Sequence, residues 1–205
     1  ASLTVDLNAS VTLNGQNISC SSGFTNNGRV YSNGTETVTI PAGSAGVWEY
    51  RAGTVHTGIS FGNLIINGTV ASPGSAFSTD KITVETGAIF NFGNNITVTN
   101  TLTNNGTIAI GNADYVLSFE NYAEGGSSSI TVGNGTIAST NGTDIQTVSR
   151  VTFTNARTTT INGAAGGIAI ASPVYNGTGL VTTGSVSLPT GTIASLDVQS
   201  GMTSA

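Results

Sequence analysis

The sequence predicts an all-β protein, built as a single-domain parallel β-helix or β-solenoid. Apolar and polar residues alternate with period two in many short segments, which is the pattern of half-buried strands. Nine Asn-Gly pairs lie between these segments, and both residue types adopt the left-handed backbone conformation of tight turns. Short phrases also recur along the chain, as they do when successive coils of a solenoid repeat one structural unit.

The alternating segments define the expected strands in chain order. Residues 143–162 form the longest stretch without Gly or Pro, and their Thr, Val, Ile and Asn residues favour strand over helix. Residues 112–124 leave a helical alternative open, because Tyr115, Phe119 and Tyr122 also fit a helical stripe. The apolar positions of the alternating segments are Leu3, Val5 and Leu7; Val38 and Ile40; Ile82 and Val84; Ile96 and Val98; Ile108 and Ile110; Tyr115, Leu117 and Phe119; Ile130 and Val132; Val151 and Phe153; and Val186 and Leu188.

The Asn-Gly pairs also fit a second architecture. Asn-Gly turns between alternating segments usually join antiparallel strands, which would give an antiparallel β-sandwich completed by a donated N-terminal strand. Repeats favour the parallel solenoid, since Ile-Thr-Val recurs at 82, 96 and 130 and Thr-Ile-Ala recurs at 107, 136 and 192. The repeats follow no strict period, and the general scale of such proteins predicts a coil of about 18 to 20 residues.

The clearest repeats lie in residues 61–112. They include N-L-I-I-N-G-T at 63–69 and I-T-V-T-N-T-L-T-N-N-G-T-I at 96–108. This region resembles the repetitive β-solenoid regions of large secreted bacterial surface proteins and adhesins, most clearly over residues 61–140. The resemblance implies stacked parallel coils and a place at the cell surface.

Composition excludes several classes of protein. Only 7% of the 205 residues are charged, against about 25% in an ordinary soluble domain. A hydrophobic fraction of 38% and a net charge of -5 are typical of a folded chain and not of a disordered one. Five scattered cationic residues provide no basic surface for nucleic acid, and no run of 18 apolar residues predicts a membrane span. Cys20 is the only cysteine, so an intrachain disulfide is impossible. The start at Ala1 leads us to expect a mature, exported chain.

Residues that could carry catalysis are sparse. A Ser-His-Asp triad would have to use His56, the single histidine, and one histidine cannot build a multi-histidine metal site. The ten acidic residues are dispersed along the chain, without the local pair of carboxylates that would announce glycoside hydrolysis. We therefore expect no enzymatic activity, no cofactor and no metal.

The densest local constellation is Trp48-Glu49-Tyr50-Arg51. Trp48 and Tyr50 could contact a glycan by stacking on a sugar ring, or the two rings could cover the core of a wide coil. Arg51 could pair with Glu49. Surface glycans are accordingly a candidate partner.

Nine sequons of the N-x-[ST] type occur, and turn chemistry alone accounts for many of them because six read Asn-Gly-Thr. In a secreted chain they are candidate glycosylation sites. Their asparagines are Asn8, Asn17, Asn33, Asn67, Asn95, Asn105, Asn134, Asn141 and Asn176.

The first 20 residues are set apart from a solenoid body at 21–205, because two alternating apolar runs lie at the very start. Such a strand either completes its own first coil or adds to a neighbouring subunit by β-augmentation. We therefore expect a non-enzymatic structural protein, extracellular or at the cell surface, whose copies assemble into a filament or surface layer; the alternative is an adhesin or glycan-binding module. The candidate assembly residues are Leu3, Val5, Leu7, Val11 and Leu13.

Overall fold

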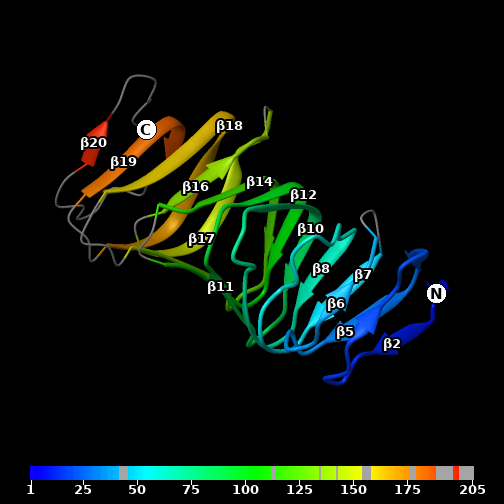
Figure 1. The fold of residues 1–205 in the computed structure, drawn as a ribbon. Coiled ribbons are helices and arrows are strands. Elements are labelled where there is room, and N and C mark those ends of the chain that lie inside the picture. Colours follow the sequence, from blue (N-terminus) through cyan, green and yellow to red (C-terminus); the bar gives the residue numbers. More distant parts are fainter. Residues whose placement is uncertain are drawn as a thin grey trace.

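The computed structural model describes residues 1–41, 46–111, 114–133, 135–141, 143–153, 158–175, 179–187 and 196–198. Within these residues every strand pair is parallel and no helix occurs. The strands stack side by side from the N-terminal end of the molecule to the last strands at its far end (Figure 1). The predicted parallel β-solenoid is confirmed. The alternative of an antiparallel sandwich is wrong, and so is the helical alternative for the segment containing β14 (Val116–Glu124).

The first side of each coil carries a continuous ladder. Val30, Trp48, Leu64, Ile82 and Leu102 lie directly beside one another in register and are all buried. Their numbers differ by 18, 16, 18 and 20, and these unequal turns explain why the sequence shows no strict period. The strands of this side are β2 (Ser10–Thr12), β5 (Arg29–Ser32), β7 (Val47–Tyr50), β8 (Asn63–Ile66), and the second halves of β10 (Phe77–Val84), β12 (Ile96–Asn104) and β14.

The second side begins after the next turn of each coil. Val70, Phe90, Ile108 and Ile130 form its inward column, and each is 0% exposed. Together with the first side, this column fills the interior of the solenoid with apolar side chains. The strands of this side are β9 (Thr69–Ala71), β11 (Ile89–Phe92), β13 (Thr107–Ile110) and β15 (Ser129–Val132).

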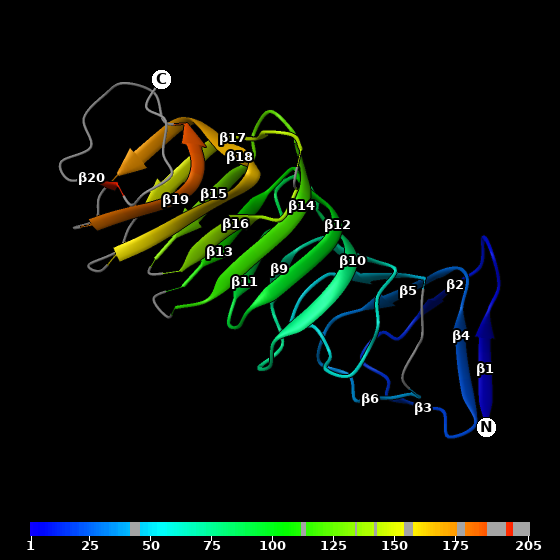
Figure 2. The same ribbon diagram turned by 90° about the horizontal axis from the view of Figure 1, so that it is seen from above.

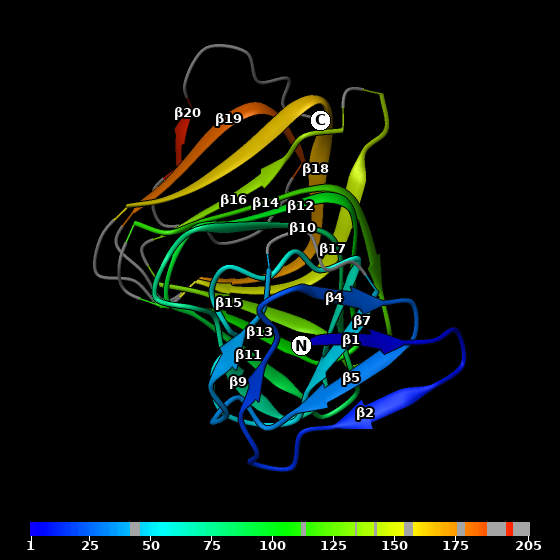
Figure 3. The same cartoon turned by 45° about the vertical axis from the view of Figure 1, so that its right-hand side comes forward.

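The third side forms where long strands bend around a corner. The register between β10 and β12 shifts between Thr79 and Lys81, and the register between β12 and β14 shifts at the equivalent place. Such irregularities bend a strand and re-aim its side chains. The first halves of β10, β12 and β14 therefore belong to this side, together with β16 (Thr136–Ser139). Figure 3 shows the strands of successive coils surrounding a common interior.

The two ends of the chain continue the same stack. β18 pairs with β16 through residues 160–163 and with β17 through residues 168–175, so it passes from one side of the coil to the others. At the N-terminus, β1 pairs with β4 and β3 pairs with β6 (Figure 2). Residues 1–20 thus form the first coil of the solenoid that the described residues after them continue. The remaining strands are β1 (Ser2–Val5), β3 (Ile18–Ser19), β4 (Gly23–Asn26), β6 (Val38–Thr39), β17 (Gln146–Phe153), β18 (Thr158–Tyr175), β19 (Gly179–Ser187) and β20 (Leu196–Val198).

The sequence Asn-Asn-Gly recurs at two corners of the stack, one before a strand of the first side (β5) and one after such a strand (β12). Asn26 and Asn104 are buried, and each accepts the backbone N–H of the glycine two residues later through its side-chain oxygen. A Cβ on Gly106 would lie 2.5 Å from the carbonyl oxygen of Ala88 in the preceding coil. Glycine is therefore required at this corner by the close approach of two coils.

Candidate functional site

Strand β7 separates the Trp-Glu-Tyr-Arg constellation into two environments. Because side chains alternate across a strand, Trp48 and Tyr50 enter the interior, where both are 0% exposed, while Glu49 lies on the outer surface. The interpretation of the two rings as glycan contacts is wrong, since a buried ring cannot stack on a sugar from solvent. The rings instead cover the core of a wide coil.

Inside the coil, the aromatic rings form one cluster. The Trp48 ring centroid lies 5.9 Å from that of Phe24 and 6.1 Å from that of Phe61. The Tyr50 hydroxyl lies 2.7 Å from Nδ1 of His56, and Nε2 of His56 lies 2.7 Å from the carbonyl oxygen of Glu36. Burial raises the pKa of Tyr50 well above its usual range. Both ring nitrogens of the single histidine are therefore engaged in holding two turns together.

Glu36 is a buried carboxylate that binds backbone N–H groups. It accepts hydrogen bonds from the backbone N–H groups of Gly15, Asn33 and Thr35 and from the Ser32 hydroxyl, at 2.8 to 3.1 Å. Burial by itself would raise the pKa of Glu36. The hydrogen bonds to the charged carboxylate lower it by a larger amount, so the pKa is about 2 instead of 4.5. Its full use of donors from the chain itself makes Glu36 a structural clamp.

On the outer surface, Glu49 lies at the centre of a charged cluster that we name the Arg-Glu-Arg cluster (Arg29, Tyr31, Glu49, Arg51 and Asn67). Glu49 accepts from Arg29 at 3.3 Å, from Arg51 at 3.1 Å and from the Asn67 amide at 2.9 Å. The Arg51 guanidinium lies 4.3 Å from the centroid of the Tyr31 ring. The predicted pairing of Arg51 with Glu49 is confirmed.

The cluster carries one net positive charge on a chain whose net charge is -5, because two guanidinium groups face one carboxylate. The Glu49 side chain is 5% exposed, whereas those of Arg29 and Arg51 are 42% and 47% exposed. The arginines thus shield the buried acid and present their remaining N–H donors to solvent.

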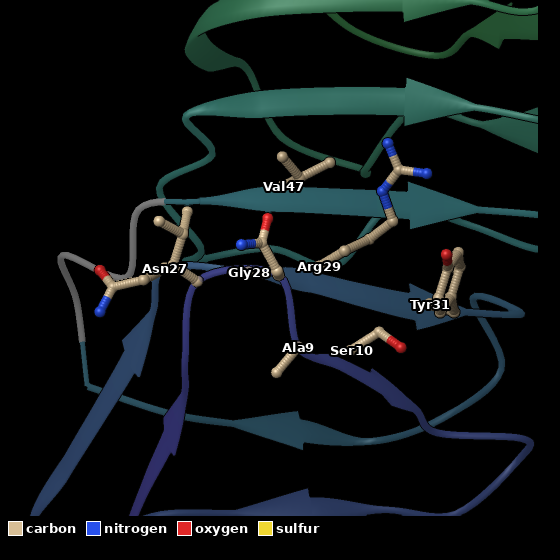
Figure 4. A pocket seen from close by; sticks show the side chains of 9 residues that line it. Ala9, Ser10, Asn27, Gly28, Arg29, Tyr31 and Val47 are labelled. Atoms are coloured by element: carbon tan, nitrogen blue, oxygen red, sulfur yellow. The ribbon is translucent and has the colours of Figure 1, made fainter.

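A shallow hollow of about 360 Å³ lies beside this cluster, near the first coil. Arg29 and Tyr31 line it from β5, with the Arg29 guanidinium directed toward β7, and Ala9 and Ser10 line it from the chain that enters β2 (Figure 4). Leu7, which is 75% exposed, gives the hollow an apolar rim. The other lining residues are Asn8, Asn27, Gly28 and Val47.

The predicted assembly residues lie in the first coil and in the turn between its strands. Val5 and Leu13 are buried, Leu3 and Val11 are half-buried and pack against the core, and Leu7 is exposed in the turn. The N-terminal segment thus completes its own first coil, one of the two expected roles.

The first coil also has an open edge, which we define as the outer main-chain groups of its three strands. Leu13 donates its N–H to the carbonyl oxygen of Tyr31, and the carbonyl oxygen of Ala9 accepts from Arg29. Because alternate residues of a parallel strand bond to the same neighbour, Val11 also faces β5, while Ser10 and Thr12 direct their N–H and C=O groups away from it. β1 and β3 show the same alternation toward β4 and β6. Among the described residues, these groups have no strand partner. The open-edge residues are Ser2, Thr4, Ser10, Thr12 and Ser19.

The sequon asparagines occupy different environments. Four are exposed: Asn8, Asn17, Asn67 and Asn95. Asn33 and Asn105 are half-buried, and Asn141 is 7% exposed with its side chain bonded to Asn121 and Thr143. Asn134 and Asn176 lie outside the described residues. Glycosylation at any of these positions stays a prediction, and the exposed four are the accessible ones.

The described part of the chain contains neither a cluster of metal-ligating side chains nor a helix that could span a membrane. Nowhere in it do three or more His, Cys, Asp or Glu side chains gather as metal ligands would. No helix there has the length and apolar character needed to cross a membrane.

Comparison of the chain with protein-family models, with curated proteins and with solved structures gave no match.

Proposed function

We propose that this chain is a non-enzymatic structural subunit that assembles end to end, outside the cell or at its surface, into a filament or surface layer. The observation that carries the proposal is the open edge of the first coil. Its strands, SLTV, SVT and IS, contain no charged residue and no proline. Natural edge strands are usually protected from pairing by charge, proline or bulges.

The occupant of the open edge is a second copy of this chain. Every coil in the described stack accepts the next through a parallel ladder of the same kind, so a parallel strand from another copy continues the pattern without new geometry. Because only 7% of the residues are charged, electrostatic repulsion between copies is small. Threonine and serine at the edge add hydroxyl groups that can bond between coils, as Thr107 and Ser129 do within the stack at 3.3 Å.

Adding charge at the open edge tests this proposal. The double variant Thr4→Lys/Thr12→Lys keeps every internal hydrogen bond of the coil and places two like charges where a copy would add. The control is Thr69→Lys/Thr97→Lys, which adds the same charge at exposed positions on the second and third sides. Sedimentation velocity should show concentration-dependent assembly of the wild type and the control, and a monomer for the edge variant. Assembly of the edge variant equal to that of the control would refute the role of the edge.

A further inference from the structure

The Arg-Glu-Arg cluster and the hollow beside it combine three features that a carbohydrate-binding site needs. The hollow has a volume of about 360 Å³, within the range of about 300 to 1,000 Å³ that small-ligand sites occupy. The Tyr31 ring and the exposed Leu7 provide apolar surface, and Arg29 provides charged donors.

The charge of the cluster indicates which class of sugar fits. Glu49 takes one contact from Arg29 through Nη1, at 3.3 Å, and it is held independently by Arg51 and Asn67. Arg29 therefore retains donors that can bind a second carboxylate, and the guanidinium fork matches a carboxylate well. Asp6 lies in the neighbouring turn but does not line the hollow, and none of the described residues that line it is acidic.

The geometry points to a binding site for a carboxylated saccharide, in which Arg29 binds the carboxylate and Tyr31 and Leu7 contact the sugar ring. This site lies on the outer surface of the first side and uses none of the main-chain groups of the open edge except those of Ser10. The site therefore shares Ser10 with the open edge, and the edge variant Thr4→Lys/Thr12→Lys leaves that residue unchanged. Trp48 and Tyr50, which the sequence had suggested as glycan contacts, have no part in it.

Saturation-transfer NMR and calorimetry with defined oligosaccharides test the site. The probes are a glucuronic acid trisaccharide, a sialylated trisaccharide and a neutral glucose trisaccharide of equal length. We expect an acidic trisaccharide to bind and the neutral one to bind at least about tenfold more weakly, the difference expected for one charged hydrogen bond. The two acidic probes distinguish uronic acids from sialic acids as the source of the carboxylate.

Two pairs of variants locate the binding. Arg29→Gln removes the charge, and Arg150→Gln is its control at another exposed arginine. Ala9→Glu places a competing carboxylate in the hollow without disturbing the partners of Glu49, and Ala9→Gln is the matched neutral control. Arg29→Gln and Ala9→Glu should each weaken binding about tenfold or more, while both controls bind as wild type does.

The edge variant Thr4→Lys/Thr12→Lys should bind the acidic trisaccharide as wild type does, so failure of assembly and failure of sugar binding are distinguishable. Equal binding of neutral and acidic sugars, unchanged binding by Ala9→Glu, or no binding of either acidic probe at about 10 mM, which is weaker than about 3 kcal/mol, would each overturn the proposal.

Discussion

The carboxylate of Glu36 accepts the backbone N–H of Gly15 at 3.0 Å, so a side chain of the second coil holds a turn of the first. Gly15 follows Asn14, and both residues have positive φ, 48° and 78°. Within this turn the Gln16 N–H donates to the carbonyl oxygen of Leu13 at 2.8 Å, and the Gly15 N–H donates to the carboxylate. This contact connects the first coil, which carries the open edge, to the rest of the solenoid.

Substitution of Glu36 should therefore destabilise the first two coils. Glu36→Gln replaces a charged acceptor with an amide whose NH₂ group faces backbone donors, and we expect a loss of about 1 to 3 kcal/mol in the free energy of unfolding. Urea denaturation measures this loss. Glu120→Gln, at an exposed position, should change the free energy of unfolding by less than about 0.5 kcal/mol. Equal stability of the two variants would contradict the clamp.

The low pKa of Glu36 also predicts a dependence of stability on pH. Its pKa is about 2 in the folded chain and 4.5 without the fold, so its contribution is fully present above pH 4.5 and is lost as the pH falls toward 2. The contribution has an upper bound of about 3.5 kcal/mol, because the two pKa values differ by about 2.5 and a pKa difference of one corresponds to about 1.4 kcal/mol; contact with solvent reduces it below this bound. The difference in unfolding free energy between wild type and Glu36→Gln should shrink between pH 5 and about pH 2. A difference that stays constant over this range would show that folding does not lower the pKa of Glu36.

Glycine at the recurring Asn-Asn-Gly corner should resist substitution. Gly106→Ala places a Cβ 2.5 Å from two backbone oxygens of the preceding coil, so coils must separate locally. We expect a destabilisation of about 2 kcal/mol or more, within the range for strain and overpacking. Gly74→Ala, which meets no atom within 4 Å, is the control and should be neutral or slightly stabilising. Thermal unfolding followed by circular dichroism compares the two variants.

Trp48 provides a direct test of the interior. It is the only tryptophan of the chain and is 0% exposed among aromatic neighbours. Its fluorescence should be blue-shifted in the native protein, insensitive to iodide and unchanged by sugars, and should shift to longer wavelength on unfolding. Iodide quenching as strong in the native as in the unfolded protein would place the ring at the surface.

Much of the fold was predictable because its signals are local. Period-two alternation at Ile82 and Val84 marks inward positions of a strand in any sheet, and both are 0% exposed. The side of the coil on which each strand lies was not predictable, because the turns differ in length. Asn-Gly was expected for its left-handed conformation, which Gly15 and Gly34 adopt, but at Gly106 the close approach of the preceding coil requires glycine.

The site shows the same limit more sharply. Tyr31 and Glu49 are 18 residues apart, and only the register of β5 against β7 makes them neighbours. The alternation of residues 48–51 also did not indicate which face of this strand would be buried, the face of Trp48 and Tyr50 or the face of Glu49 and Arg51. Arg29 lies in register with Val47, 18 residues later, and Glu49 is the next residue of β7 on the outer face. The contact between Arg29 and Glu49 could therefore have been predicted only with the register known.

End-to-end addition of copies through the open edge is tested most directly by negative-stain electron microscopy of the purified chain at increasing concentration. We expect unbranched filaments whose length grows with concentration, with fibre diffraction along the filament axis at about 4.7 to 4.9 Å, the spacing of adjacent strands. Thr4→Lys/Thr12→Lys should give separate particles under the same conditions. Separate particles of the wild-type chain at every concentration would contradict end-to-end assembly.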